Sequence, residues 1–344
     1  MGKTVLLITG GTGGHVFPAI SLMKMNAELN YLVILDHRTE WIVKKQKFKY
    51  VKVYSSKINL NLKLPLSILK IILGIIQSLF IIIKYKPDLA IGFGGYTSIP
   101  TILAARILNI KTIIHEQNAV MGKTNRILSK FVNYVALTFK ETKFARKDSL
   151  ITGIPVRKKP IKLKRLVSKK KAKRLLVIGG SQGAKVFNSL VPKILSNLKD
   201  SNRKKIIVSQ QIKKNEMRKT MSLYKKINIR FIFKEFFEDI YDEINKADLI
   251  ISRCGSSTLA EIELFQKYCI LFPLPSAMNN HQYYNALEFK KKNNCLIVDE
   301  NNLNSTKLSA VIEDKIFSKR QKSNKYYKIK NKLTLSKLVK EVLI

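Results

Sequence analysis

The chain is poor in cysteine, and the placement of its three cysteines argues against two classes of protein. Cys254, Cys269 and Cys295 show neither the spacing of a metal site nor the pattern of a disulfide framework. A reducing cytoplasm is therefore the expected environment. No secretory signal is expected either, since the first three residues lead directly into an apolar run. No zinc-finger or RNA-recognition motif is recognisable.

Acidic residues are scarce as well. The chain has 23 of them against 64 lysines and arginines, and its formal net charge is +41. This charge either attracts a polyanion, such as nucleic acid or an anionic membrane, or reflects a bias toward lysine, asparagine and isoleucine spread over solvated surfaces. We favour the bias as the source of most of the charge. If the positive charge does bind a partner, we expect an anionic membrane surface. No nucleic acid partner is expected.

Two glycine-rich turns, one in each half, are the main feature that the chain does have. Gly10-Gly11-Thr12-Gly13-Gly14-His15 follows the apolar residues 5–8, and Gly179-Gly180-Ser181-Gln182-Gly183 follows the apolar residues 175–178. Each predicts a strand, a tight turn and a helix, where glycine lets the backbone approach a ligand and the helix N-terminus can hold a phosphate. The 344 residues suffice for two domains with separate cores. The turns predict two similar domains facing a shared cleft, which suits joining a nucleotide-activated donor to an acceptor.

Apolar strand-length segments alternate with helix-length segments in both halves. In the first half the expected strands are residues 5–8, 32–35, 50–54, 89–92, 112–115, 134–137 and 149–152, with helices such as 18–29 and 99–108 between them. In the second half they are residues 175–178, 205–209, 229–232, 249–252, 269–272 and 295–298. This alternation predicts doubly wound parallel sheets, whose ligands bind beyond the carboxyl ends of the strands. The first glycine turn, the Gly94-Gly95-Tyr96 turn and residues 115–118 should meet at such an edge.

A basic, aperiodic stretch at residues 158–174 is the expected linker between the domains. The first domain is then residues 1–157 and the second residues 175–324. The lysine-rich tail after Ser318 is expected to be helical, and its last part, about 325–344, to pack back on the first domain.

Residues 66–83 form an almost wholly apolar segment. Its polar or small members recur every three or four residues and therefore form one narrow stripe on a helix: Ser67, Lys70, Gly74, Gln77 and Ser78. Three interpretations are open. We favour a helix that packs on the sheet by one side and touches lipid by the other, over a deeply buried core helix and over a membrane span, in which Lys70 would be costly. Four nearby lysines could contact anionic headgroups: Lys57, Lys63, Lys84 and Lys86.

Two polar segments of the second half carry candidate binding chemistry. Residues 252–261 predict a strand, a turn at Gly255 and a helix whose first N–H groups could hold a diphosphate without a metal. Glu261, about one turn into that helix, could accept hydrogen bonds from ribose hydroxyls or simply compensate the helix dipole. The amides of residues 280–286 suit sugar hydroxyls, although such residues also occur on ordinary polar surfaces.

Taken together, these motifs resemble the MurG family of N-acetylglucosaminyltransferases in order and spacing. The resemblance covers residues 5 to about 300 and rests on residues 10–19, 94–96, 115–118 with Asn125, 153–157, 179–184 and 253–261. It implies a GT-B fold of two Rossmann-like domains. It also implies inverting transfer of N-acetylglucosamine from UDP-N-acetylglucosamine to the muramyl C4 hydroxyl of lipid I. The product would be lipid II of peptidoglycan synthesis, made by a peripheral enzyme on the cytoplasmic face of the inner membrane.

The resemblance also implies roles for individual residues. His15 is the candidate general base, since histidine titrates in the useful range, and Glu116 is the second candidate catalytic residue. The donor would contact Thr12, Gly13, Gly14, Asn118, Arg157, Ser181, Phe237, Ser256, Ser257, Thr258, Leu259, Ala260, Glu261 and Gln282. The acceptor side or the floor of the cleft would include Tyr96, His115 and Asn125. No cofactor and no obligatory metal are expected, because no Asp-X-Asp pair is evident.

Several structural alternatives stay open at these positions. His15 could cap or orient its helix, His115 and Glu116 could be a structural pair, and Arg253 could form an interdomain salt bridge. The chain departs from the family at Cys254, where serine is more common, and at Ile154, where a polar residue is common.

Two rival functions stay open as well. One is another UDP-sugar enzyme of the same fold, such as a lipid glycosyltransferase or a UDP-N-acetylglucosamine epimerase. The other is a non-enzymatic basic binder of nucleic acid or membrane, although such a binder would not need two glycine turns and a diphosphate-type loop.

Overall fold

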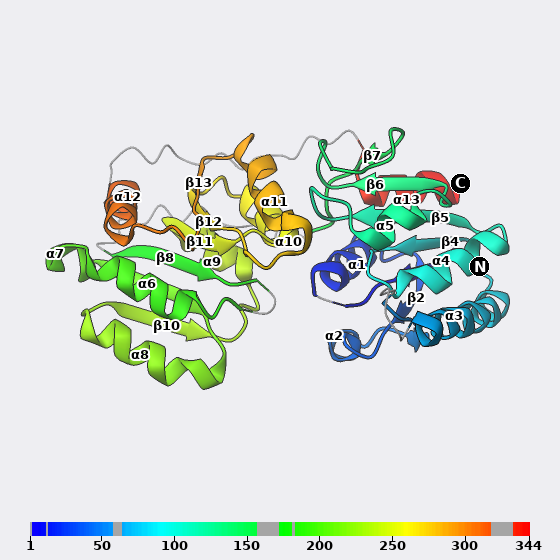
Figure 1. The fold of residues 1–344 in the computed structure, drawn as a ribbon, viewed down its shortest axis with the longest axis horizontal. Helices are drawn as coiled ribbons and strands as arrows, with labels where there is room; N and C mark the ends of the chain where they lie inside the picture. Colours follow the sequence, from blue (N-terminus) through cyan, green and yellow to red (C-terminus); the bar gives the residue numbers. More distant parts are fainter. Residues whose placement is uncertain (1, 12, 58–63, 157–171, 181–182, 318–332) are drawn as a thin grey trace. The chain divides into compact units, whose positions relative to one another are not determined.

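The computed structural model of the chain describes residues 2–11, 13–57, 64–156, 172–180, 183–317 and 333–344. The chain divides into two compact units, residues 1–158 with 330–344 and residues 159–329, and Figure 1 shows both. Each unit has its own parallel sheet and its own helices.

The sheet of the first unit has seven strands in the order β3-β2-β1-β4-β5-β6-β7, all parallel. The strands are β1 (Thr4–Ile8), β2 (Asn30–Leu35), β3 (Tyr50–Lys52), β4 (Leu89–Gly92), β5 (Lys111–Glu116), β6 (Tyr134–Leu137) and β7 (Leu150–Ile151). The central strands are buried on both faces, which is why they read as continuous apolar runs in the sequence.

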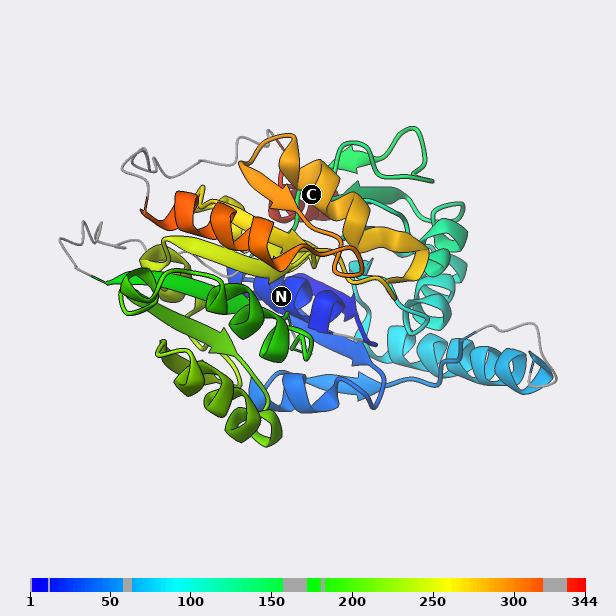
Figure 2. The same ribbon diagram turned by 60° about the vertical axis from the view of Figure 1, so that its left-hand side comes forward.

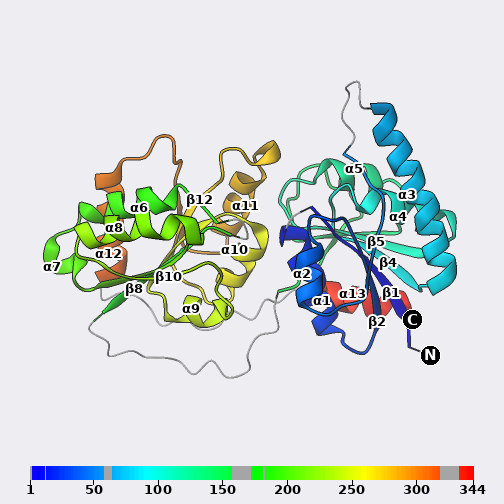
Figure 3. The ribbon, with the colours of Figure 1, turned by 90° about the horizontal axis from the view of Figure 1, so that it is seen from below.

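Helices cover both faces of this sheet (Figure 3). One face carries α1 (Gly13–Met25), α2 (Glu40–Lys45) and α13 (Leu335–Leu343), and the other carries α3 (Leu64–Tyr85), α4 (Ser98–Ile107) and α5 (Lys123–Leu128). The side chains of β1 alternate between the two layers, with Val5 and Leu7 in the first and Leu6 and Ile8 in the second. The first unit is therefore a doubly wound sheet with a core on each face.

The end of the chain completes the first of these cores. α13 buries Leu335, Leu338 and Val339 against α1 and the sheet. The Ser336 hydroxyl also donates to Asn26 Oδ1 at 2.6 Å, beyond the last turn of α1. A helix that follows the whole second unit in sequence thus belongs to the core of the first.

α3 lies on the opposite face and is only half covered. Gly74 lies where an added Cβ would come within 2.0 Å of the Tyr54 carbonyl oxygen, and the Ser78 hydroxyl lies 3.0 Å from that of Thr101 on α4. The small residues of the stripe therefore let α3 lie close against its neighbours. Eight large apolar side chains of the helix are exposed: Leu66, Ile68, Leu69, Ile72, Leu73, Ile76, Phe80 and Ile83.

The exposed side chains show that α3 is not a deeply buried core helix, so that interpretation is wrong. The N-terminal part of α3 extends beyond α4 and α5 in the first unit (Figure 2). By length and composition alone, α3 would be sufficient to cross a bilayer, but the packed stripe holds it against the unit.

The second unit repeats the arrangement with six parallel strands in the order β10-β9-β8-β11-β12-β13. These are β8 (Lys173–Ile178), β9 (Ile206–Gln211), β10 (Arg230–Lys234), β11 (Leu249–Arg253), β12 (Cys269–Phe272) and β13 (Cys295–Ile297). One face packs on α6 (Phe187–Ser196), α8 (Met217–Lys226) and α12 (Ser305–Phe317), and α9 (Ile240–Lys246) lies on the other. The remaining helices are α7 (Asp200–Arg203), α10 (Ser256–Glu263) and α11 (His281–Lys290). The predicted fold class, two doubly wound α/β domains, is confirmed.

The boundaries of individual elements differ from the prediction in a few places. α1 begins at Gly13 rather than Pro18, so that this proline lies inside the helix at its sixth position, where its missing N–H removes the hydrogen bond to the Gly14 carbonyl. β8 begins at Lys173 and takes the last residues of the expected linker. Residues 158–171 of that linker, and the lysine-rich residues 318–332, lie outside the described part of the chain.

Candidate functional site

The candidate site residues gather where each sheet reverses its strand order. In the first unit β1 lies between β2 and β4, and in the second β8 lies between β9 and β11. Loops that leave neighbouring strands in opposite directions at such a point form the usual ligand site of an open α/β sheet. The first glycine turn follows β1 and the second follows β8, so that both lie at this position.

The first glycine turn holds His15 in a defined orientation. His15 lies in the first turn of α1, and its Nδ1 lies 2.9 Å from the Gly10 carbonyl oxygen. Because a carbonyl only accepts, this contact assigns the proton to Nδ1 and the lone pair to Nε2. The imidazole is therefore oriented by the turn, with the lone pair on Nε2.

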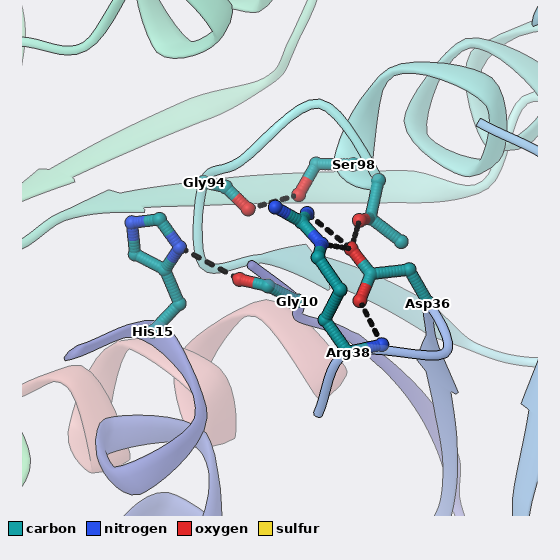
Figure 4. A network of polar contacts seen from close by, with 7 residues as sticks. Gly10, His15, Asp36, Arg38, Gly94 and Ser98 are labelled. Atoms are coloured by element: carbon teal, nitrogen blue, oxygen red, sulfur yellow. Dashed lines mark hydrogen bonds and ion pairs between the residues drawn. The ribbon is translucent and has the colours of Figure 1, made fainter. Parts of the chain in front are cut away.

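The Gly94-Gly95 turn after β4 lies against the same imidazole. Both glycines have positive φ, +86° and +76°. A Cβ on Gly94 would lie 3.5 Å from His15 Nε2 and 3.4 Å from Asn125 Nδ2, and the Ser98 hydroxyl donates to the Gly94 carbonyl at 3.0 Å (Figure 4). Glycine is favoured at both positions because of their positive φ, and the turn it permits lies in van der Waals contact with His15 and Asn125.

Glu116 is buried at the end of β5, and both of its carboxylate oxygens accept hydrogen bonds. Oε1 accepts from the backbone N of Asn118 at 3.0 Å and from its Nδ2 at 3.3 Å, while Oε2 accepts from the backbone N of Gly122 at 3.0 Å and from Asn125 Nδ2 at 2.8 Å. The carboxylate thus joins Asn118, in the loop after β5, to the first turn of α5. This geometry fits a residue that positions Asn118 and Asn125.

His115 is fully buried one residue earlier. Its Nε2 lies 2.9 Å from the Gly153 carbonyl oxygen, and its Nδ1 lies 3.2 Å from the side-chain amide nitrogen of Gln117. Burial lowers the pKa of His115 to about 4, so that the ring is neutral at neutral pH. His115 therefore fits the structural alternative, a ring that ties β5 to the Gly153 segment.

One cluster beside this turn was missed in the sequence. Asp36, at the end of β2, accepts hydrogen bonds from the backbone N and the guanidinium of Arg38 and, at 2.9 Å, from the Thr97 hydroxyl. The guanidinium lies over the Tyr96 ring at 4.4 Å. Burial raises the pKa of the Asp36 carboxyl, but the hydrogen bonds from Arg38 and Thr97 outweigh it and hold that pKa below its usual value. The available signal was an Asp-X-Arg sequence directly after a buried strand.

The second glycine turn is open to a ligand. An added Cβ on Gly179 would lie 2.1 Å from the backbone N of Ala184, so only glycine fits there. Gly180 and Gly183 both have positive φ, and a Cβ on either would meet no described atom within 4 Å. Ser181 of this turn, like Thr12 and Arg157, lies outside the described residues.

The loop between β11 and α10 forms the second part of this region. Gly255 caps α10 with extended backbone, and Ser256 begins the helix. The hydroxyl oxygen of Ser257 is buried and has no hydrogen-bond partner among the described residues. A buried, unpartnered hydroxyl at a helix N-terminus is suited to an anion. Thr258 is half-buried beside it, Leu259 and Ala260 are buried in the helix, and Glu261 is half-buried one turn on.

α11 holds this loop in place through its amides. Gln282 Oε1 accepts from the backbone N of Cys254 at 3.0 Å and of Leu274 at 3.1 Å, and Asn285 Nδ2 donates to the Cys254 carbonyl at 3.0 Å. The carbonyl end of Gln282 is thus used within the protein, and its NH2 group is the end suited to a sugar hydroxyl. Asn285 was not singled out in the sequence as a residue that positions this loop.

Two further side chains of the second unit lie within its core. Arg253 pairs with Glu300 at 2.6 Å and donates to the Phe272 and Pro273 carbonyls, so that the contacts described for it lie within the second unit. Phe237 is buried in the loop between β10 and α9. Among the described residues, no group of three or more histidine, cysteine, aspartate or glutamate side chains could hold a metal ion.

Comparison with known proteins places this chain among the glycosyltransferases. The glycosyltransferase family 28 N-terminal domain matches residues 5–137, and the C-terminal domain of the same family matches residues 174–342. The chain belongs to glycosyltransferase family 28. This membership confirms an enzyme of the glycosyltransferase class and argues against a non-enzymatic basic binder.

Individual family 28 relatives agree over most of the chain. A UDP-N-acetylglucosamine--N-acetylmuramyl-(pentapeptide) pyrophosphoryl-undecaprenol N-acetylglucosamine transferase of Wolbachia sp. subsp. Drosophila simulans (strain wRi) is 38% identical over 90% of this chain and 89% of its own length. The enzyme of the same name from Rickettsia canadensis (strain McKiel) is 35% identical over 91% of each chain. These relatives confirm the resemblance to the MurG family.

Solved structures give the same result at the level of the fold. The crystal structure of Acinetobacter baumannii MurG covers 91% of this chain and 90% of its own, with a TM-score of 0.74 and 28% identity. The structure of a putative UDP-N-acetylglucosamine 2-epimerase from Listeria monocytogenes covers 95% of this chain and 93% of its own, with a TM-score of 0.59 and 12% identity. At this identity the likeness shows a shared fold alone.

Proposed function

We propose that this family 28 enzyme transfers N-acetylglucosamine from UDP-N-acetylglucosamine to the muramyl C4 hydroxyl of lipid I, the undecaprenyl-diphosphoryl-N-acetylmuramyl-pentapeptide. The anomeric carbon inverts, and the product is the β-1,4-linked lipid II of peptidoglycan synthesis. The names of the Wolbachia and Rickettsia relatives support the reaction, because they describe this donor and this acceptor.

The second unit binds the donor. Its anion site consists of the Gly180–Gly183 turn and the N-terminus of α10, where the Ser257 hydroxyl lacks a partner among the described residues. Ser256 and Thr258 flank that hydroxyl, Glu261 holds the ribose, and the NH2 group of Gln282 faces the sugar. The uracil lies at Phe237, and the remaining donor contacts come from Gly13, Gly14, Asn118, Thr12, Arg157 and Ser181.

His15 is the base in the first unit. As the C4 hydroxyl attacks the anomeric carbon, its proton passes to Nε2 of His15, and the bond from that carbon to the diphosphate oxygen breaks with its electron pair on UDP. Main-chain N–H groups at the α10 N-terminus, with Arg157, stabilise the charge that develops on the diphosphate. Glu116 acts as a positioning residue through Asn118 and Asn125, Tyr96 lies on the acceptor side, and the buried His115 ties β5 to the Gly153 segment without touching the acceptor.

The enzyme works as a peripheral protein on the cytoplasmic face of the inner membrane. The acceptor carries an undecaprenyl chain, so that the enzyme must reach it at the bilayer surface. The exposed apolar face of α3, with Lys57, Lys84 and Lys86 near its ends, supplies both apolar contact and attraction to anionic lipid headgroups.

The observation that carries the proposal is the pair of sites at the two strand-order reversals. One unit has an oriented imidazole, and the other has a buried hydroxyl at a helix N-terminus that lacks a partner among the described residues. The test is transfer of radiolabel from UDP-N-acetylglucosamine to a synthetic lipid I analogue, with UDP-glucose as the control donor. Labelled disaccharide product from the first donor alone supports the proposal. No product with correctly folded enzyme that binds UDP contradicts it.

A further inference from the structure

The Asp36–Arg38 cluster fixes a guanidinium beside the first glycine turn. The Asp36 side chain is 5% exposed and that of Arg38 is 36% exposed, so the carboxylate is the buried member of the pair. Asp36 Oδ2 accepts from Nε and Nη2 of Arg38, and the Tyr96 ring covers one face of the guanidinium. The side chain is thereby held in one orientation before any ligand arrives.

One end of this guanidinium has no hydrogen-bond partner in the described part of the chain. Among the described residues, no hydrogen-bond partner is present for Nη1 of Arg38, while Nη2 lies 3.3 Å from where a Cβ of Gly11 would be. Gly11 has a φ of +81° and no side chain to block the approach. The guanidinium therefore lies next to the backbone of the glycine turn, with Nη2 nearest and Nη1 3.8 Å from the same Cβ position.

His15 and Arg38 lie on either side of Gly10 (Figure 4). The imidazole contacts the Gly10 carbonyl, and the guanidinium approaches Gly11, the next residue. A hydroxyl placed at His15 and an anion placed at Arg38 would thus belong to one compact ligand bound along this turn.

We propose that Arg38 binds the diphosphate of the lipid-linked acceptor, an inference that rests on the proposed function. The acceptor named for the relatives carries a pyrophosphoryl group, which lies across the same sugar ring from the reactive hydroxyl. The donor diphosphate is assigned to the second unit, so this anion needs its own partner in the first. A planar guanidinium suits a diphosphate because it donates two parallel hydrogen bonds.

Steady-state kinetics of Arg38→Gln with a soluble, short-chain lipid I analogue test the proposal. The variant keeps polar contact with Asp36 and removes the charge, so the KM for the acceptor should rise about 10- to 100-fold while the KM for UDP-N-acetylglucosamine changes less than about twofold. Arg38→Lys should recover part of the loss. Lys44→Ala, which removes the same charge from exposed α2, is the matched control and should leave both KM values unchanged.

Direct binding of inorganic pyrophosphate separates this inference from the proposed function. Calorimetry is run on the full chain with UDP at saturation, so that the donor site is blocked. Weaker pyrophosphate binding in Arg38→Gln, but not in Lys44→Ala, supports Arg38 even if the wild-type enzyme transfers no sugar. Equal pyrophosphate binding in all three proteins overturns the inference, as does an equal rise of both KM values, because Arg38 would then serve only to neutralise Asp36.

Discussion

The proposed reaction depends most directly on His15. Replacing it with alanine should lower kcat by about 10²- to 10⁴-fold, since the attacking hydroxyl would lose its general base, while the affinity for UDP should stay within about twofold. His15→Asn is the second variant, because its amide can still donate to the Gly10 carbonyl but cannot accept the proton. Single-turnover transfer assays and UDP calorimetry measure the two quantities. Wild-type turnover in His15→Asn would mean that the imidazole only orients the turn.

His115 gives the first unit a predictable dependence on pH. Its pKa of about 4 in the folded protein lies below the ordinary value of 6.5, so between these values the unfolded chain binds a proton that the folded chain does not. The stabilisation is complete above about pH 6.5 and is lost as the pH falls toward 4, by about 2 kcal/mol between pH 7 and pH 5.

Denaturant unfolding at pH 7 and pH 5 measures this effect. His115→Gln should be less stable than the wild type at pH 7 but should lose less stability on acidification. The control is His281→Gln, which changes a half-buried histidine of α11. The same loss on acidification in the wild type and His115→Gln would show that His115 does not cause the pH dependence.

The position of a site residue could be predicted from the sequence where that residue belongs to a short local motif. His15 lies five residues from the carbonyl it contacts, so the glycine turn and the imidazole appear together in one short stretch. Asp36 and Thr97 lie 61 residues apart, and Asp36 also needs Arg38 in a particular rotamer. No spacing rule links such residues, because only the strand order brings their loops to one edge of the sheet.

Among the elements, α3 shows best how packing adds to pattern. The sequence showed the narrow stripe of polar and small residues, but it did not show which face of the helix packs against the rest of the first unit. The structure buries the small members of the stripe, Gly74 and Ser78, because they allow close contact, and leaves Lys70 exposed. The central strands matched their predicted positions because buried parallel strands are continuous apolar runs, whereas helix ends depend on turns that the pattern does not specify.

The exposed face of α3 leads to a test of membrane binding. Ile72→Asp and Ile76→Asp place a charge at positions that are 48% and 46% exposed, so folding should be little affected. Binding to vesicles of phosphatidylglycerol and cardiolipin should fall at least about tenfold, since apolar insertion and attraction to anionic headgroups are both weakened. Activity on a short-chain soluble acceptor should change far less.

Ser189→Asp supplies the control, because it adds the same charge to an exposed position of α6 in the second unit. Sedimentation with vesicles and the soluble assay are run on the same preparations. If the α3 variants lost vesicle binding and soluble activity to the same extent, α3 would serve the fold and not the membrane.

In the whole molecule, two separate cores explain why the architecture could be predicted early. Each glycine turn marks the central strand of one sheet, so two turns indicated two units. The sequence predicts less clearly which unit the end of the chain packs on, because α13 is a short amphipathic helix that could cover either sheet. It buries Val339 completely in the first unit, while Lys340 beside it is exposed.

This division predicts that damage to α13 affects one unit and spares the other. Val339→Asp places an unpaired charge in the first core and should lower its stability by about 3 kcal/mol or more, whereas Lys340→Asp should have a small effect. In calorimetric unfolding, the transition of the first unit should move to lower temperature in Val339→Asp alone. The transition of the second unit should keep its upward shift with UDP, because a ligand of the folded second unit stabilises only that unit. A single transition that loses its UDP shift in Val339→Asp would mean that the two units unfold together.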